Sequence, residues 1–108
     1  MQPMRFEPVT LIQLRRDLMR RGAILATLLG EVLAGKRPPA LAAMLAARPG
    51  ARPEEVLRRA LDQIERRRRL IDERSEDYGR CELCGVDLGA PALLEMPWAD
   101  RCTAHAAQ

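Results

Sequence analysis

Residues 78–105 read YGRCELCGVDLGAPALLEMPWADRCTAH and hold all three cysteines and the one histidine of the chain. Cys81 and Cys84 stand three positions apart, as do Cys102 and His105, and seventeen residues separate the two pairs. A C-x2-C pair followed by C-x2-H is typical of zinc sites, because a tight turn presents two ligands from positions three apart. The stretch therefore predicts a zinc site built from these four side chains.

The ligand set indicates a structural rather than a catalytic metal. A structural zinc ion takes all four ligands from the protein, whereas a catalytic one keeps a position for water. Gly85 follows the first pair and allows its turn to close without a Cβ penalty. If His105 does not bind, water or a carboxylate such as Asp100 remains as the fourth ligand. We expect one structural Zn²⁺ in a small zinc-finger module over residues 80–108.

The composition favours long helices in one small domain, or in a helical hairpin with a module attached. The chain has 108 residues and three aromatic side chains, so its core is aliphatic. The odd cysteine count argues against a closed disulfide framework and fits a reducing cytoplasm. The N-terminal stretch MQPMRFEP has no apolar signal region, and no apolar run approaches the roughly 20 residues that cross a bilayer. We expect a cytoplasmic protein that makes no membrane contact.

A first long helix is expected over about residues 10–35, with Thr10 as its cap. Its apolar positions recur at alternating spacings of three and four, the pattern of a heptad seam, with Arg21 as an interruption. The seam positions are Leu11, Leu14, Leu18, Leu25, Leu28 and Val32. Four further residues widen this stripe, either as core or as a docking face for a partner: Ile12, Ile24, Leu29 and Leu33.

A second long helix is expected over residues 53–78. Pro53 suits its first turn, and Gly79 stands where a left-handed residue ends a helix. The apolar positions follow the same spacing and are Leu57, Leu61, Ile64, Ile71 and Tyr78. Two matched amphipathic helices joined by a short connection predict a mainly α fold, an antiparallel coiled-coil helical hairpin over residues 1–79.

The connection, residues 36–52, contains four basic residues and no acid. Pro38 and Pro39 end the first helix, and a short helix follows to about Ala47. Its apolar side chains either cap the end of the hairpin or form an adaptable contact surface beside the basic residues. The candidate partner-binding residues of this tip are Lys36, Arg37, Met44, Arg48 and Arg52.

The run Arg66–Arg69 points around all sides of its helix, so it forms no single basic patch. Acids three or four positions away can pair with it, namely Asp62, Glu65, Asp72 and Glu73. No aromatic residue interleaves with it, so the stacking signature of single-strand binders is missing. We expect no direct nucleic-acid binding. We expect no enzyme either, because the one histidine is assigned to zinc and no nucleophile–base arrangement is recognisable.

With these elements in place, the sequence resembles the DksA/TraR zinc-finger family of bacterial RNA polymerase-binding regulators. That family's pattern is Y-G-x-C-x-x-C-G, an apolar spacer, and P-x-A-x-x-C-x-x-C. The chain matches it at Tyr78, Gly79, Cys81, Cys84, Gly85, Pro97, Ala99 and Cys102. His105 stands where the family usually has cysteine. The acidic D-x-x-D-x-A tip motif of DksA-type members has no counterpart in residues 36–52.

The resemblance implies a transcription regulator that inserts its hairpin into the secondary channel of RNA polymerase. A basic tip would be attracted to the acidic metal-binding site of the polymerase. The alternative is a zinc-stapled coiled-coil adaptor or oligomerisation protein that does not act on polymerase, and the broad apolar stripe of the first helix supports it.

Overall fold

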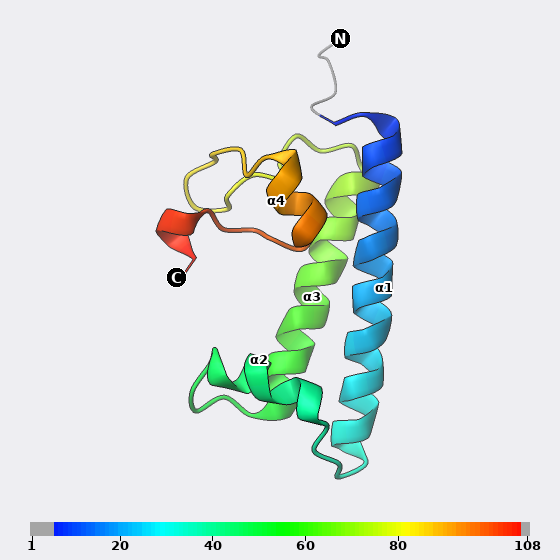
Figure 1. Cartoon of the computed structure of the whole chain (residues 1–108), viewed down its shortest axis with the longest axis vertical. Coiled ribbons are helices and arrows are strands. Elements are labelled where there is room, and N and C mark those ends of the chain that lie inside the picture. The colour runs from blue at the N-terminus through cyan, green and yellow to red at the C-terminus, as the bar shows by residue number, and fades with distance from the viewer. Residues whose placement is uncertain (1–5, 107–108) are drawn as a thin grey trace.

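The computed structural model describes residues 6–106. Residues 1–5, which belong to the N-terminal stretch without an apolar signal region, and residues 107–108 lie outside the described residues. The elements in order are α1 (Pro8–Leu33), the 3-10 turn η1 (Pro39–Leu41), α2 (Ala42–Ala46), α3 (Pro53–Asp72), α4 (Ala90–Glu95) and the 3-10 turn η2 (Thr103–His105). α1 and α3 pack side by side and run in opposite directions (Figure 1). Residues 6–106 contain no β-strand, only a bridge between Arg80 and Asp87. The prediction of a mainly helical fold is confirmed.

The first helix begins and ends two residues earlier than its sequence pattern indicated. Its cap is Glu7 and not Thr10, because Pro8 already has the fixed φ that suits a first helical turn. At the other end Gly35 adopts a left-handed φ of 87°. The Lys36 N–H donates to the Glu31 carbonyl at 2.9 Å, so the last carbonyls of α1 are satisfied by a Schellman turn.

The second long helix ends six residues before the predicted Tyr78. Arg74 takes the left-handed φ of 55° that ends α3, and the Ser75 N–H donates to the Leu70 carbonyl at 2.9 Å. Gly79 is also left-handed, at φ 80°, but lies in the turn that follows. The chain leaves the helix here, and Tyr78 is buried with its hydroxyl donating to the Pro97 carbonyl at 3.0 Å.

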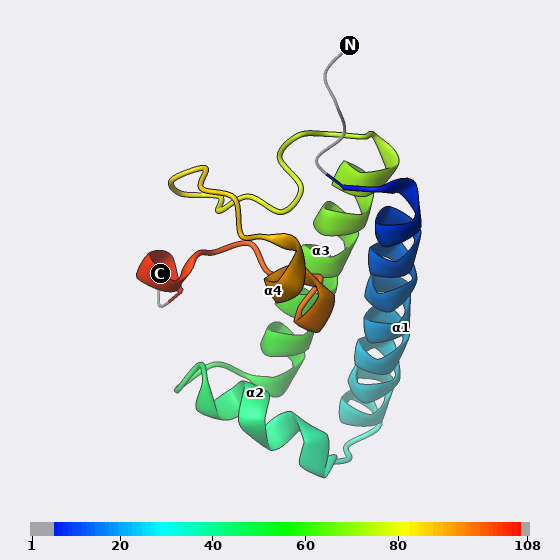
Figure 2. The ribbon, with the colours of Figure 1, turned by 45° about the horizontal axis from the view of Figure 1, so that its top comes forward.

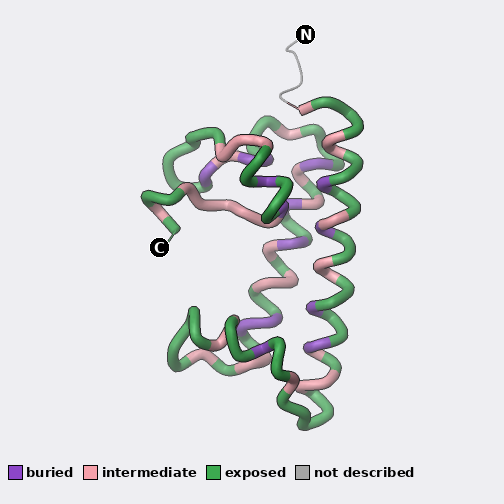
Figure 3. Tube along the Cα trace, in the orientation of Figure 1, coloured by how far each residue is buried: buried purple, intermediate pink, exposed green. Residues whose placement is uncertain are grey.

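One aliphatic core lies between α1 and α3. The buried positions of the two helices face each other along their length (Figure 3). Leu93 of α4 joins the same core and is fully buried, and Leu41 closes it at the α2 end. The core residues are Leu14, Leu18, Leu25, Leu28, Leu41, Leu57, Ile64, Ile71, Tyr78 and Leu93.

The molecule is elongated, with dimensions of 51 × 27 × 20 Å. α2, α4 and the C-terminal segment (residues 80–106) lie on the α3 side of the helix pair, as two views show (Figures 1 and 2). Across residues 6–106, no helix combines the length and apolarity that crossing a membrane requires.

Candidate metal centre

Cys81, Cys84, Cys102 and His105 come together in the C-terminal segment. Their ligand atoms all lie within 4.8 Å of one another. His105 Nδ1 is 3.7 Å from Cys81 Sγ and 3.1 Å from Cys102 Sγ, and the sulfurs of Cys84 and Cys102 are 3.8 Å apart. The structure therefore groups all four residues that the spacing predicted, as a site able to hold a metal ion.

A local turn over residues 81–86, here called the knuckle, presents the first pair of cysteines. The Gly85 N–H donates to the Cys81 carbonyl at 2.9 Å, and the Cys81 N–H donates to the Val86 carbonyl at 2.9 Å. Gly85 has a φ of 75°, which an L side chain rarely adopts, so the glycine is required for the knuckle to close. The two thiols then point to the same side of the turn.

The second pair is held by η2 and by a link to the knuckle. The His105 N–H donates to the Cys102 carbonyl at 3.0 Å, which places both side chains on one side of a single turn. The Glu82 N–H donates to the Asp100 carbonyl at 2.9 Å and joins the two halves of the site. The Asp100 carboxylate, the alternative fourth ligand, is not part of the cluster.

The spacing of the donors fits a tetrahedral ion. With Zn–S bonds of about 2.3 Å and Zn–N bonds of about 2.0–2.1 Å, neighbouring ligand atoms are about 3.5–3.8 Å apart. The distance between the Cys84 and Cys102 sulfurs, 3.8 Å, and that from Cys81 to His105, 3.7 Å, match this edge. The Cys102–His105 distance of 3.1 Å is shorter than this edge.

The environment of the knuckle favours thiolate at one cysteine. Burial raises the pKa of Cys81, but backbone N–H groups of Cys102, Cys84 and Leu83 outweigh it and lower this pKa to about 6. At Cys84, hydrogen bonding to Val86 lowers the pKa, but lost hydration and the neighbouring thiols raise it overall. A thiolate is the form in which cysteine binds a metal.

Glu82, between the first two cysteines, anchors the cluster to α3. Its carboxylate accepts a 2.7 Å hydrogen bond from Arg67 of α3 and another from Arg101. Arg66 lies 3.8 Å from the same carboxylate. Burial raises the pKa of Glu82, and the guanidinium groups of Arg101 and Arg67 lower it by more. The sequence pattern missed this role, because these two partners are 15 and 19 positions away.

Arg67 is the one buried charged residue among residues 6–106, with 5% of its surface exposed. Only its Nη2 has a hydrogen-bond partner, while Nε and Nη1 are buried without one. Loss of the Glu82 carboxylate would therefore leave a buried cation with no counter-charge.

The rest of the run Arg66–Arg69 is paired as well. Arg66 lies 3.3 Å from Asp62, Arg68 binds Glu65 and Asp72, and Arg69 lies 3.9 Å from Glu65. Three of the four acids proposed as partners make these pairs. Glu73 makes none in the described part of the chain.

The basic residues of the tip behave differently. All four are exposed, and none makes an ion pair with any residue of the described chain: Lys36, Arg37, Arg48 and Arg52. Met44 is half-buried and packs against the core, together with Leu45. The tip thus combines apolar side chains that pack on the core with four basic side chains that make no ion pair in the described chain.

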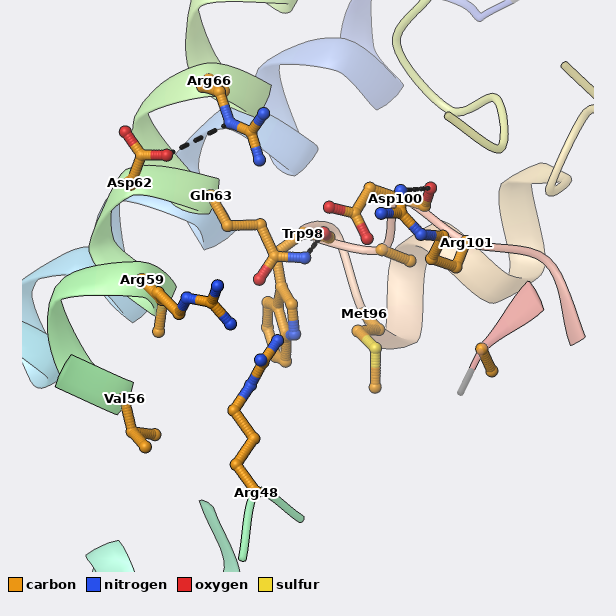
Figure 4. A pocket seen from close by; sticks show the side chains of 13 residues that line it. Arg48, Val56, Arg59, Asp62, Gln63, Arg66, Met96, Trp98, Asp100 and Arg101 are labelled. Carbon is orange, nitrogen blue, oxygen red and sulfur yellow. Dashed lines mark hydrogen bonds and ion pairs between the residues drawn. The ribbon is translucent and has the colours of Figure 1, made fainter. Parts of the chain in front are cut away.

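A cleft of about 720 Å³ lies between α3, the connection and the C-terminal segment (Figure 4). Arg48 extends from the connection toward Trp98, and Arg59 extends into the same space from α3. Neither arginine has an ion-pair partner within residues 6–106. Gln63 donates to the Trp98 carbonyl at 2.9 Å, and the Arg21 guanidinium lies 5.0 Å from the centre of the indole, so Trp98 packs on both long helices.

Comparison of the chain with models of known protein families, with curated proteins and with solved structures gives no match.

Proposed function

We propose that the protein is a bacterial, cytoplasmic transcription regulator that binds RNA polymerase through the basic tip of a helical hairpin. One structural zinc ion would hold its C-terminal segment against the base of that hairpin. The observation that carries the proposal is the contrast in charge. The run Arg66–Arg69 is neutralised within the chain, whereas the four cations of the tip make no ion pair with any of residues 6–106.

The zinc assignment rests on the donor set. Three sulfurs and one imidazole nitrogen fill a tetrahedral site without water, the arrangement of structural zinc. In so small a segment, metal binding supplies a large part of the folding free energy. Metal analysis of the purified protein should give one zinc per chain, and Cys84→Ser should lower this content. A full content in that variant would contradict the assignment.

The tip supports docking on an acidic surface. Lys36, Arg37, Arg48 and Arg52 lie at the end of the hairpin, and Arg59 continues the positive charge into the cleft. Exposed charges of this kind accelerate association with an oppositely charged partner and set its orientation. The cysteine pattern resembles that of the DksA/TraR family, and this resemblance indicates RNA polymerase as the partner. The secondary channel of the polymerase is the expected docking position.

Co-purification with RNA polymerase core tests the partner directly. We expect the zinc-loaded chain to bind at modest salt and an excess of a secondary-channel factor to displace it. If the chain does not bind the polymerase, the coiled-coil adaptor becomes the favoured function. Binding that the factor does not displace would place the protein elsewhere on the polymerase.

Charge reversal tests the tip. Lys36→Glu with Arg37→Glu, or Arg48→Glu with Arg52→Glu, should weaken binding roughly tenfold, the effect of about 1.4 kcal/mol. The control is Arg20→Glu with Arg69→Glu, whose side chains are 68% and 62% exposed and lie on the long helices away from the tip. It causes the same change in net charge and should leave affinity unchanged. Equal affinity of tip and control variants would contradict docking through the tip.

A further inference from the structure

The side of α1 that faces away from α3 carries a second stripe at alternating spacings of three and four. All of its members are exposed: Val9, Ile12, Arg16, Met19, Ala23, Ala26, Gly30 and Leu33. The large apolar members are exposed by 75% at Val9, 60% at Ile12, 48% at Met19 and 59% at Leu33. No other element covers this side of α1, which is largely exposed in Figure 3. The stripe therefore has the pattern of a helix seam but no partner within residues 6–106.

Gly30 in this stripe has no explanation inside the single chain. Glycine destabilises a helix interior relative to alanine, so it needs a packing reason. Gly22 has one, since a Cβ there would meet Ile64 Cγ2 at 3.4 Å. At Gly30 a Cβ would meet nothing within 4 Å. The missing side chain leaves room on the outer face, where only another molecule can use it.

We propose that a second copy of this chain occupies the stripe, with its α1 antiparallel to the first. In a register that covers the whole stripe, Ile12 lies opposite Gly30 and Met19 lies opposite Ala23. Arg16 lies opposite Ala26, and Val9 opposite Leu33. Each large side chain of the N-terminal half thus meets a small residue of the C-terminal half, apart from the apolar pair at the ends. This is the complementarity of knobs packed into holes.

The position of Arg16 favours the same orientation. Arg16 makes no ion pair within the described residues, and a parallel pair would place it against its own copy. A parallel pair would also set Gly30 against Gly30 and leave a void. In the antiparallel pair the two Arg16 side chains are about 15 Å apart along the axis, and each lays its methylene chain over Ala26 of the other copy. The arrangement is two-fold symmetric, as in most homodimers.

The proposed interface is narrow. A 26-residue helix is about 39 Å long, and its contact strip is about 10 Å wide. Each copy contributes about 390 Å², or about 780 Å² in total, which is below the roughly 1,200 Å² of stable specific interfaces. The dimer is therefore weak, and its formation should depend on protein concentration. The inference is independent of polymerase binding, because the stripe contains none of the proposed tip residues.

Sedimentation of the zinc-loaded full chain over a range of concentrations tests the dimer. We expect the wild type to approach twice the monomer mass and Ile12→Glu to remain monomeric. Ile24→Glu is the matched control, because Ile24 is also on α1 and 48% exposed but lies off the stripe. It should dimerise as the wild type does. A wild type that stays monomeric at every concentration overturns the proposal.

Gly30→Gln separates association from folding. Glutamine is a better helix former than glycine and meets nothing in the single chain, so the thermal midpoint of the monomer should rise. The same side chain would fill the space of Ile12 from the second copy, so the dissociation constant should rise at least tenfold. Unchanged association in a folded Gly30→Gln protein overturns the proposed register.

Disulfide trapping tests the orientation. Two single variants, Val9→Cys and Leu33→Cys, are mixed in their zinc-loaded form and oxidised gently. Antiparallel pairing brings residue 9 of one copy next to residue 33 of the other, so a mixed disulfide should form. Residue 9 is then about 36 Å from its own counterpart, and Val9→Cys alone should not cross-link. Efficient cross-linking of Val9→Cys with itself would show a parallel pair and overturn the proposal.

Discussion

At the scale of single residues, Glu82 connects the metal cluster to the helix pair. It lies inside the C-x2-C knuckle, and its carboxylate is shared by Arg67 and Arg101. Arg67 has two buried nitrogen atoms without partners, so it depends on this one acid for its neutralisation. Removing one partner of a buried pair leaves an uncompensated charge, which costs more than the pair itself contributes.

Replacing Glu82 by glutamine should therefore destabilise the protein more than its surface position indicates. We expect a loss of about 1–3 kcal/mol in the free energy of unfolding, below the value for a fully buried pair because the Glu82 side chain is 25% exposed. Urea denaturation of the zinc-loaded protein measures it. Glu95→Gln, in the same segment and without an ion pair in residues 6–106, is the control and should change stability by less than about 0.5 kcal/mol. Equal effects of the two variants would show that Glu82 does not anchor the knuckle.

At the scale of the elements, one ion pair joins the start of α1 to the end of α3. Arg15 binds Asp72 through two of its nitrogen atoms, at 2.7 Å from Nε and 3.3 Å from Nη2. Arg68 binds the same carboxylate from within α3. Asp72 is the last residue of α3, directly before the turn at Arg74 that redirects the chain toward the metal cluster. The pair therefore lies where the helices and the C-terminal segment diverge.

This pair predicts a defined loss of stability in acid. The hydrogen bond from Arg15 lowers the pKa of Asp72 below its ordinary value of 3.8. A carboxyl with a lowered folded-state pKa stabilises the protein above its unfolded-state pKa, and this contribution disappears as the pH falls through the folded-state value. The stability difference between wild type and Asp72→Asn should be constant near neutral pH and shrink below about pH 4.

Urea midpoints measured at several pH values check this expectation, with Glu73→Gln as the neighbouring control. Glu73 makes no ion pair in the described chain, so its variant should follow the wild type across the whole range. A wild type and an Asp72→Asn variant that differ equally at pH 3 and pH 7 would contradict a role for the ionised carboxylate.

At the scale of the whole molecule, one core serves both the helix pair and the C-terminal segment. Leu93 and Tyr78 are buried in it, and Trp98 packs between Arg21 and Gln63. The metal cluster itself lies outside this core, with Cys84 exposed and Cys102 and His105 half-buried. Packing and the Arg15–Asp72 pair therefore hold α1 and α3 together, whereas we expect the end of the C-terminal segment to depend on a metal in the cluster.

Metal removal should affect the helix pair and the C-terminal segment differently. With zinc in the cluster, a chelator should abolish most of the near-UV signal of Trp98 while the far-UV helical signal of α1 and α3 largely remains. Added zinc should restore the near-UV signal, and Cys84→Ser should show the low signal without chelator. A Trp98 signal that chelation leaves unchanged would show that packing, and not metal, orders the segment.

The sequence by itself determined the grouping of Cys81, Cys84, Cys102 and His105 and the mainly helical fold with α3 starting at Pro53. Within each ligand pair, side chains three positions apart meet across one turn. Pro53, followed by the acidic residues Glu54 and Glu55, suits the first turn of a helix. The pairing of Arg66, Arg68 and Arg69 with acids three or four positions away follows a local rule of the same kind.

Only the tertiary structure decided which of several apolar faces is buried and where the second helix stops. Ile12, Ile24 and Leu33 remain exposed while Leu29 packs on the core, although all four widen the same stripe. The heptad spacing continues to Tyr78, yet α3 ends at Asp72 and Tyr78 is buried outside it. These outcomes, and the attachment of Glu82 to Arg67, depend on contacts between distant segments, and such contacts leave no trace in local spacing.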